Sequence, residues 1–155
     1  MRLEQKAAQL LASKKKTVSL AESCTGGLLS HRLTNVPGSS NYLKLAVVAY
    51  SNEAKEKTLK ISPPLMKKHG AVSGAVATAM AKGVREILKT DFGVSITGIA
   101  GPTGGTLQKP TGLTFIAVAT ELETLCLECR FQGTRAGIKS QAANQALRLL
   151  IEFLT

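Results

Sequence analysis

The sequence Ala21-Glu22-Ser23-Cys24-Thr25-Gly26-Gly27 joins a short β-like run, residues 17–20, to an apolar helical pattern that begins at Leu28. The first N–H groups of a helix have no partner within the helix, and the helix dipole places partial positive charge there. Glycine lets a ligand approach the backbone, and Ser and Thr side chains add donors. The segment therefore fits an anion or oxyanion site. It fits equally well an ordinary helix start in which Ser23 or Thr25 is the N-cap residue.

The composition indicates a globular chain. Its 155 residues predict one domain, 1–155, that is long enough to bury a core. Hydrophobic residues make up 44% of the chain, but only 4% of residues are aromatic and Trp is absent, so Ala, Leu, Val and Ile must build that core. No apolar run approaches the ~18–20 residues of a membrane span, and the first residues do not resemble a signal peptide. We therefore expect a cytoplasmic protein without a membrane partner.

The formal charge of +10 and the pI near 9.8 predict an anionic partner. The basic residues are scattered apart from Lys14-Lys15-Lys16 and Lys67-Lys68-His69, and no aromatic residues alternate with them. This pattern favours a basic surface that attracts a phosphorylated small molecule over dedicated nucleic-acid binding. His69 precedes Gly70 and is interpreted as a partner of a helix C-terminus.

Three cysteines do not form a disulfide framework. Cys126 and Cys129 have CxxC spacing, but they lie in an alternating strand-like run, where residues three apart point to opposite faces. The chain has no second such pair and only two histidines, so we expect no zinc site and interpret both cysteines as structural.

Hydrophobic periodicity and punctuating Gly and Pro residues predict an alternation of helices and strands. Ser51 or Asn52 is expected to begin one helix and Ser73 another. The apolar run 45–50 predicts a buried strand, and a long glycine-rich loop follows Thr97. The order favours a three-layer α/β/α sandwich with a mixed, largely parallel sheet. Helices are expected near 3–13, 28–34, 52–59, 64–68, 74–89 and 136–153, and strands near 17–21, 45–50, 92–96, 113–120 and 124–131.

Three loops are expected to meet at one edge of this sheet, because ligands bind where parallel strands end. They are residues 23–27, 50–55 and 97–105, and they hold Ser, Thr, Tyr and Lys but no His. An acid–base site without His or a carboxylate pair points to Ser–Lys or Ser–Tyr–Lys chemistry. A lysine acts as a base only when neutral, and lowering its pKa from about 10.4 to ~7–8 requires roughly 4 kcal/mol. Lys55 lies in the first turn of its predicted helix, where a cation is disfavoured.

Five segments of the chain resemble the CinA C-terminal-domain family in their order and spacing, and the match to the family covers nearly the whole chain. The segments are Ala21–Gly27, Pro37-Gly38-Ser39-Ser40, Ala49-Tyr50-Ser51-Asn52-Glu53-Ala54-Lys55, His69-Gly70-Ala71-Val72-Ser73 and Thr97-Gly98-Ile99-Ala100-Gly101-Pro102-Thr103-Gly104-Gly105. Members of this family include amidases that hydrolyse nicotinamide mononucleotide to nicotinate mononucleotide and ammonia in pyridine-nucleotide recycling. The resemblance implies a stand-alone, metal-independent and cofactor-free form of this amidase, and a homo-oligomer.

The resemblance also implies the site residues. Ser40 is predicted to be the nucleophile and Lys55 the base, with Tyr50 relaying or orienting the proton. The alternative places the nucleophile at Ser23, at the strand-to-helix turn where serine hydrolases often hold it. The other implied residues bind the substrate or donate hydrogen bonds to the oxyanion, and Arg135 contacts the phosphate. They are Thr25, Gly26, Gly27, Thr97, Gly98, Gly101, Gly104, Gly105 and Arg135.

Two positions depart from the family pattern. Thr103 stands where Asp is common, and Gly133-Thr134-Arg135 replaces Gly-Asp-Arg. These losses motivate a second hypothesis, a nucleotide-binding or protein-interaction module without activity. The positive charge and the family's association with competence motivate a third, a nucleic-acid-associated protein. Cys24 has no nearby His and is interpreted as a small packing residue.

Overall fold

A mixed five-stranded sheet forms the centre of the computed structural model, which describes residues 1–155. Its strands lie in the order β2 (Leu43–Val48), β1 (Val18–Glu22), β3 (Phe92–Gly98), β4 (Leu113–Ala119) and β5 (Thr124–Arg130). β1 pairs in parallel with β2 and with β3. The β3–β4 and β4–β5 pairs are antiparallel. The predicted mixed sheet is confirmed, with its parallel part at β2, β1 and β3.

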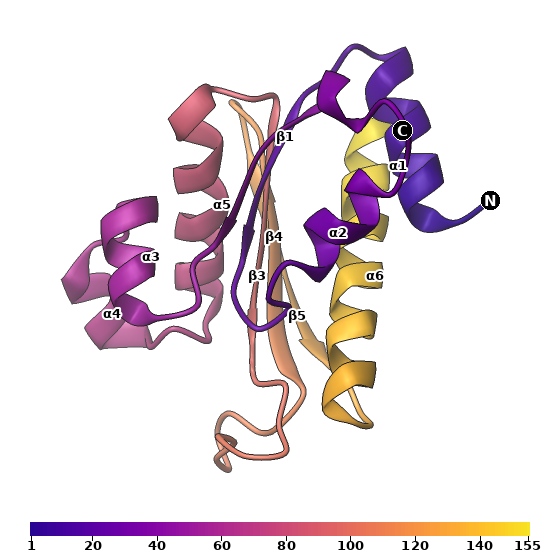
Figure 1. Ribbon diagram of the computed structural model, residues 1–155. Helices are drawn as coiled ribbons and strands as arrows, with labels where there is room; N and C mark the ends of the chain where they lie inside the picture. The colour runs from indigo at the N-terminus through magenta and orange to yellow at the C-terminus, as the bar shows by residue number, and fades with distance from the viewer.

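Helices cover both faces of this sheet (Figure 1). α1 (Leu3–Ser13), α2 (Leu28–Thr34) and α6 (Arg135–Leu154) lie on one face. α3 (Asn52–Leu59), α4 (Pro63–His69) and α5 (Gly74–Leu88) lie on the other, and a 3-10 turn at Ser39–Asn41 leads into β2. This confirms the expected three-layer α/β/α sandwich. None of these helices combines the length and the apolar character that crossing a membrane would require.

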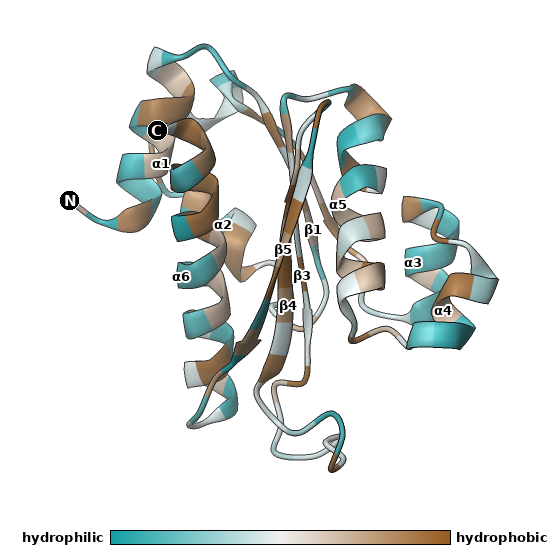
Figure 2. Cartoon of the chain, turned by 180° about the vertical axis from the view of Figure 1, so that it is seen from behind, coloured by the Kyte–Doolittle hydropathy of each residue, from teal (hydrophilic) through white to brown (hydrophobic).

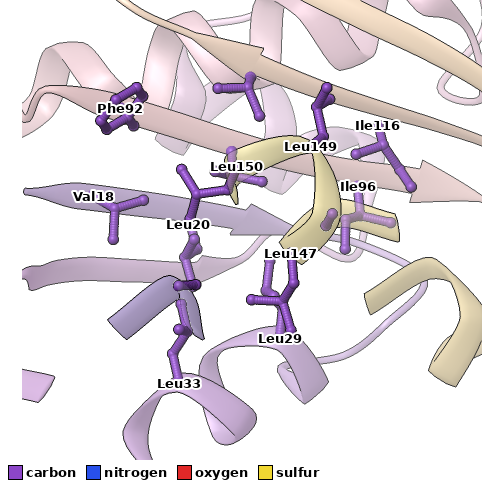
Figure 3. Close-up of a cluster of buried hydrophobic side chains, with 14 of the residues drawn as sticks. Val18, Leu20, Leu29, Leu33, Phe92, Ile96, Ile116, Leu147, Leu149 and Leu150 are labelled. Carbon is purple, nitrogen blue, oxygen red and sulfur yellow. The ribbon is translucent and has the colours of Figure 1, made fainter. Parts of the chain in front are cut away.

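The larger part of the core lies between the sheet and the α1, α2 and α6 layer. Side chains from β1, β3 and β4 meet Leu29 and Leu33 of α2 and Leu147, Leu149 and Leu150 of α6 (Figure 3). The helices present brown, apolar sides to the sheet and teal sides to solvent (Figure 2). On the other face Ala77 and Ala81 of α5 pack against Ala117 and Ala119 of β4. The aliphatic composition therefore fills this core with few aromatic rings, as expected.

Close packing of α5 on β3 depends on Gly93. A Cβ atom added at Gly93 would overlap the carbonyl oxygen of Ala81 and the side chain of Arg85. We expect Gly93→Ala to destabilise the protein by ~3 kcal/mol, because the helix would have to move away from the sheet. Gly74→Ala is the control: its Cβ would meet only ordinary contacts with Phe115 and Cys126 at 3.7 and 3.8 Å. It should leave stability unchanged or raise it by up to ~1 kcal/mol. Urea unfolding midpoints measure both, and equal midpoints would contradict the close approach.

One predicted strand differs from its expected environment. Residues 45–50 were expected to form a buried strand, but β2 begins two residues earlier, ends at Val48 and lies at the edge of the sheet. Its residues alternate between half-buried and exposed, and Val48 is 48% exposed. A continuous apolar run does not reveal whether a strand has neighbours on one side or on both, so the prediction of a buried strand was wrong.

The connection after β1 crosses one face of the sheet, and the connection after β2 crosses the other. α2 follows β1 on one face, whereas α3, α4 and α5 follow β2 on the other (Figure 1). Such a reversal opens a crevice at the carboxyl ends of parallel strands, where ligands bind in open α/β sheets. The long loop from β3 to β4 extends from the same edge (Figure 1). A ligand site is therefore expected in this crevice.

Candidate active site

A cavity of about 270 Å³ lies at this edge of the sheet. Its walls come from the loops after β1, β2 and β3, from the segment before α5 and from the first residue of α6. Two basic side chains, Lys55 and Arg135, and no carboxylate side chain line it. The lining residues are Ser23, Cys24, Tyr50, Asn52, Lys55, Ala71, Val72, Thr97, Gly98, Ile99, Ala100, Gly101, Thr103, Gly104 and Arg135.

The centre of the cavity wall is a buried pair, Ser23 and Lys55. Nζ of Lys55 lies 2.9 Å from Oγ of Ser23 and donates a longer hydrogen bond, 3.3 Å, to the carbonyl oxygen of Tyr50. Lys55 is 2% exposed and Ser23 is 7% exposed. No carboxylate forms an ion pair with this amine. A buried lysine without a counter-ion is costly, and such groups gather at functional sites.

Local structure explains how Lys55 reaches Ser23. Ser51 is the N-cap of α3, and its Oγ accepts a hydrogen bond of 3.0 Å from the N–H of Ala54. The helix therefore begins at Asn52 and holds Lys55 in its first turn, beneath the loop that leaves β1. The predicted placement of this lysine at a helix start is confirmed.

Burial lowers the pKa of Lys55, because the charged amine loses its hydration. Cys24 acts in the opposite direction, since a thiolate there would favour the charged lysine. Burial raises the pKa of the Cys24 thiol to about 11, however, so this thiol carries no charge near neutral pH. Burial thus favours the neutral form of Lys55, which is the form that can accept the serine proton.

The structure does not bring Ser40 to Lys55, and the predicted pairing of these two residues is corrected. Ser40 lies exposed in the 3-10 turn before β2, outside the cavity, and its carbonyl oxygen accepts a hydrogen bond from Lys44. Ser40 precedes β2, whereas Lys55 follows it. β2 has six residues at ~3.3 Å per residue, so Ser40 and Lys55 lie at opposite ends of this strand. The geometry favours Ser23, the alternative nucleophile.

Tyr50 and Arg135 form a bridge across the cavity mouth. Arg135 donates from Nη2 to the Tyr50 hydroxyl at 3.0 Å and from Nη1 to the Gly101 carbonyl oxygen at 2.6 Å. The hydroxyl of Tyr50 is therefore engaged by α6, and only the backbone of Tyr50 contacts Lys55. This geometry does not support the proton relay expected of Tyr50. A guanidinium has five N–H donors, so Arg135 keeps donors for an anionic ligand.

The N-terminus of α2 is already occupied by a side chain of the protein, Glu22. This carboxylate is 1% exposed and accepts hydrogen bonds of 2.9 Å from the backbone N–H groups of Leu29 and Ser30. The Thr25 hydroxyl donates to it at 2.7 Å. Of the two interpretations of the glycine-containing segment, the structure thus favours a helix start. The N-cap residue is Gly27, and the Glu22 carboxylate supplies the side-chain acceptor that was expected from Ser23 or Thr25. The expectation that α2 would offer its N-terminus to a ligand is corrected.

Sequence reasoning missed Glu22, although one signal was present. An acidic residue directly before a small, glycine-rich helix start can fold back onto the free N–H groups and interact favourably with the helix dipole.

We expect Glu22→Gln to destabilise the protein by ~2 kcal/mol, because an amide NH2 would face backbone donors and the charge–helix interaction would be lost. Glu53→Gln is the matched control on an exposed i,i+4 ion pair and should change the free energy of unfolding by less than ~0.5 kcal/mol. Urea denaturation measures both, and a Glu22→Gln variant as stable as the control would contradict the buried cap.

Several backbone N–H groups near Ser23 donate to no other backbone group. The N–H of Ser23 donates to Ile96, and that of Gly26 donates back to the carbonyl oxygen of Ser23. The N–H of Cys24, by contrast, donates to no backbone carbonyl oxygen. The same holds for the N–H groups of the β3–β4 loop at Ala100, Gly101, Thr103 and Gly104, all of which line the cavity. These groups are the available donors for an oxyanion or a phosphate.

The remaining predicted binding residues divide into two groups. Those that line the cavity are Thr97, Gly98, Gly101, Gly104 and Arg135, whereas Thr25, Gly26, Gly27 and Gly105 do not. Thr97 uses its hydroxyl to donate to the Ala71 carbonyl oxygen at 2.9 Å, so its role in the wall is structural.

The two departures from the family pattern have different consequences. Thr134 is the N-cap of α6, and its Oγ1 accepts a hydrogen bond of 3.1 Å from the N–H of Gly137. Thr and Asp are both preferred N-cap residues, so this departure leaves Arg135 at the start of α6. Thr103 lies exposed in the cavity wall, where an acid would otherwise add a negative charge.

A further basic residue, Lys139, lies beside the Ser23 loop and was not predicted. It follows Arg135 by one turn of α6, and its Nζ lies 3.8 Å from the point that a Cβ on Gly26 would occupy. No acidic side chain forms an ion pair with it. The i,i+4 spacing of two basic residues at the start of the last helix was the available signal.

The cysteines outside the cavity pack on opposite faces of the sheet, as expected. Cys126 contacts the α5 side and Cys129 the larger core on the α6 side. No three His, Cys, Asp or Glu side chains lie close enough together to hold a metal ion.

Comparison with known proteins agrees with the fold and covers nearly the whole chain. Residues 1–154 match the family model described as the CinA C-terminal domain. The chain is 48% identical to a putative competence-damage inducible protein of Moorella thermoacetica and 51% identical to a CinA-like protein of Koribacter versatilis. Both matches cover 96% of this chain and 36% of the relative, so the chain spans about a third of the length of these curated relatives.

Solved structures show the same fold at lower identity. The competence/damage inducible protein CihA of Agrobacterium tumefaciens superimposes with a TM-score of 0.94 at 35% identity, covering 99% of this chain and 96% of that one. The competence damage-inducible protein A of Klebsiella pneumoniae gives 0.95 at 30% identity, over 98% and 94%. With the family match over residues 1–154, these likenesses establish that the chain belongs to the CinA C-terminal domain family.

Proposed function

We propose that this domain is an amidohydrolase that converts nicotinamide mononucleotide to nicotinate mononucleotide and ammonia, in the recycling of pyridine nucleotides. The observation that carries the proposal is the buried contact of 2.9 Å between Nζ of Lys55 and Oγ of Ser23, at the wall of a cavity without carboxylates. Pairs of this kind activate serine for attack on amides in several unrelated folds. A cytoplasmic location and assembly into a homo-oligomer belong to the same proposal.

In the proposed reaction Lys55 accepts a proton and returns it in each step. The neutral amine takes the Ser23 hydroxyl proton while Oγ bonds to the carboxamide carbon, and the carbonyl oxygen becomes an oxyanion. The free N–H of Cys24 and those of the β3–β4 loop stabilise this oxyanion. The Lys55 ammonium then protonates the amide nitrogen, the C–N bond breaks and ammonia leaves. Water attacks the acyl-enzyme with Lys55 as base, and this step releases the carboxylate and restores Ser23.

The cavity suits a small phosphorylated ligand. Its volume lies just below the range for small-molecule sites, roughly 300–1,000 Å³, and Arg135, the first residue of α6, lines it. Arg135 offers a positive charge there. A phosphate bound at this end would leave the opposite end of the ligand near Ser23.

Arg135 is expected to act mainly in binding. Arg135→Met should raise KM for nicotinamide mononucleotide about 10- to 100-fold with a smaller change in kcat, because a charge-assisted phosphate contact is lost. Arg148→Met, on the exposed side of the same helix, is the control and should leave both constants unchanged. Steady-state kinetics separate the two constants, and a loss confined to kcat would argue against a phosphate contact.

The test of the proposed function is ammonia release from nicotinamide mononucleotide by the purified protein, measured with and without a chelator. The rate should rise with pH along a limb below the ordinary pKa of lysine, because only the neutral amine is active. A Ser23→Ala preparation controls for contaminating amidases. Tight mononucleotide binding without ammonia release would instead support a binding module, the function that the exposed Thr103 favours.

A further inference from the structure

Lys55 lies where the charge of a bound ring would act on it directly. The ring of nicotinamide mononucleotide is a pyridinium, which carries a positive charge. The attacked carboxamide carbon must come within ~3–3.5 Å of Ser23 Oγ, and this oxygen is 2.9 Å from Nζ of Lys55. Two ring atoms separate the ring nitrogen from the carboxamide carbon, so the nitrogen falls within about one Debye length, ~10 Å at 0.1 M salt, of Nζ.

We propose that the cationic ring of the substrate drives the proton off Lys55, so that binding itself produces the neutral base and the site selects carboxamides carried by cationic rings over neutral ones. The inference rests on the proposed function. It extends it by naming the feature of the substrate, its ring charge, that turns the base on.

The groups around Lys55 leave this repulsion uncompensated. On the β1 side the Cys24 thiol, whose pKa is about 11, stays uncharged, and the Glu22 carboxylate is engaged by the N-terminus of α2. On the β2 side the phenol of Tyr50 is bonded to Arg135.

The other walls also lack a negative charge. The segment before α5 contributes Ala71 and Val72, and β3 contributes Thr97. At the α6 end the charged groups are the cations Arg135 and Lys139, so no anion there opposes the field of the cationic ring. A carboxylate at position 103 would have opposed this field, and this chain has Thr there.

Coupling between the ring and the proton must be reciprocal. If the cationic ring expels the proton, the ring must bind more tightly when Lys55 is neutral, and its affinity rises with pH. A reduced, uncharged dihydronicotinamide ring of nearly the same shape should not show this coupling. A like charge at this distance shifts a titration by about one to two pH units.

The test is calorimetric. Ser23→Ala protein binds nicotinamide mononucleotide or its dihydro form without turnover, between pH 7 and 9, in two buffers that differ in ionisation enthalpy. The phosphate is common to both ligands, so the difference between them reports the ring charge. We expect the oxidised ligand to release up to one proton more than the reduced ligand. The difference should vanish in Ser23→Ala/Lys55→Met. Equal proton release by the two ligands, or failure of the oxidised ligand to bind, overturns the inference.

A kinetic measurement on the wild-type protein gives an independent readout. The acidic limb of kcat, which reports the complex, should lie about one to two pH units below the limb of kcat/KM, which reports the free enzyme. Coincident limbs with normal ammonia release would overturn the inference and leave the proposed function standing. Proton release on binding, without ammonia production by the wild-type protein, would support the inference about ring charge and overturn the proposed function.

Discussion

Replacing Ser23 by Ala is expected to abolish ammonia release, with kcat lowered ~10⁴- to 10⁶-fold, because the side chain that forms the acyl-enzyme is lost. Ser40→Ala should change the rate by less than ~2-fold, since an exposed serine outside the cavity contributes little to stability or binding. Nicotinamide mononucleotide should still bind to the Ser23 variant, because the free loop donors and Arg135 remain.

The comparison between these two serines decides which of them is the nucleophile. Single-turnover experiments with each variant detect the acyl-enzyme directly. A fully active Ser23→Ala protein, or an inactive but folded Ser40→Ala protein, would show that the contact between Ser23 and Lys55 is not the catalytic one.

Replacing Lys55 by Met is expected to have opposite effects on activity and stability. Turnover should fall at least ~10⁴-fold, because the Met side chain can neither accept nor return a proton. At pH 7 the variant should be as stable as the wild type or more stable by ~1–3 kcal/mol, because a buried amine without a counter-ion is replaced by an apolar side chain of similar length. Stability gained together with activity lost is typical of a group retained for function.

The stability difference should depend on pH in a definite direction. Burial lowers the pKa of Lys55 in the folded protein, so between that value and about 10.5 the unfolded chain binds more protons. Wild-type stability attributable to Lys55 therefore rises with pH across this window, and the advantage of Lys55→Met shrinks as the pH approaches 10. Urea denaturation at pH 7 and pH 10 measures the change.

Lys57→Met is the matched control in the same helix. Its amine is exposed in an ion pair with Glu53, so activity should persist and stability should change by less than ~0.5 kcal/mol at either pH. A Lys55→Met protein that retained normal turnover would remove Lys55 from the mechanism.

Local signals in the sequence were sufficient to predict the architecture. Ser51 and Ser73 begin helices as expected, and the three loops of the site meet at the predicted edge of the sheet. Helix caps and hydrophobic periodicity act between residues a few positions apart, so the chain reveals them without a fold. The same locality makes the placement of Lys55 in the first turn of α3 predictable.

Only the tertiary structure decided which side chains meet. Ser40 and Ser23 both lie near glycines in the chain, but Ser40 precedes β2 and Ser23 follows β1, and the parallel pairing of these strands sends them to opposite edges. The capping of α2 by the Glu22 carboxylate and the edge position of β2 likewise depend on contacts that the local pattern does not encode. Composition and spacing thus determined the layers and the loops. Strand order and direction, which arise from contacts between distant segments, chose the serine that faces Lys55.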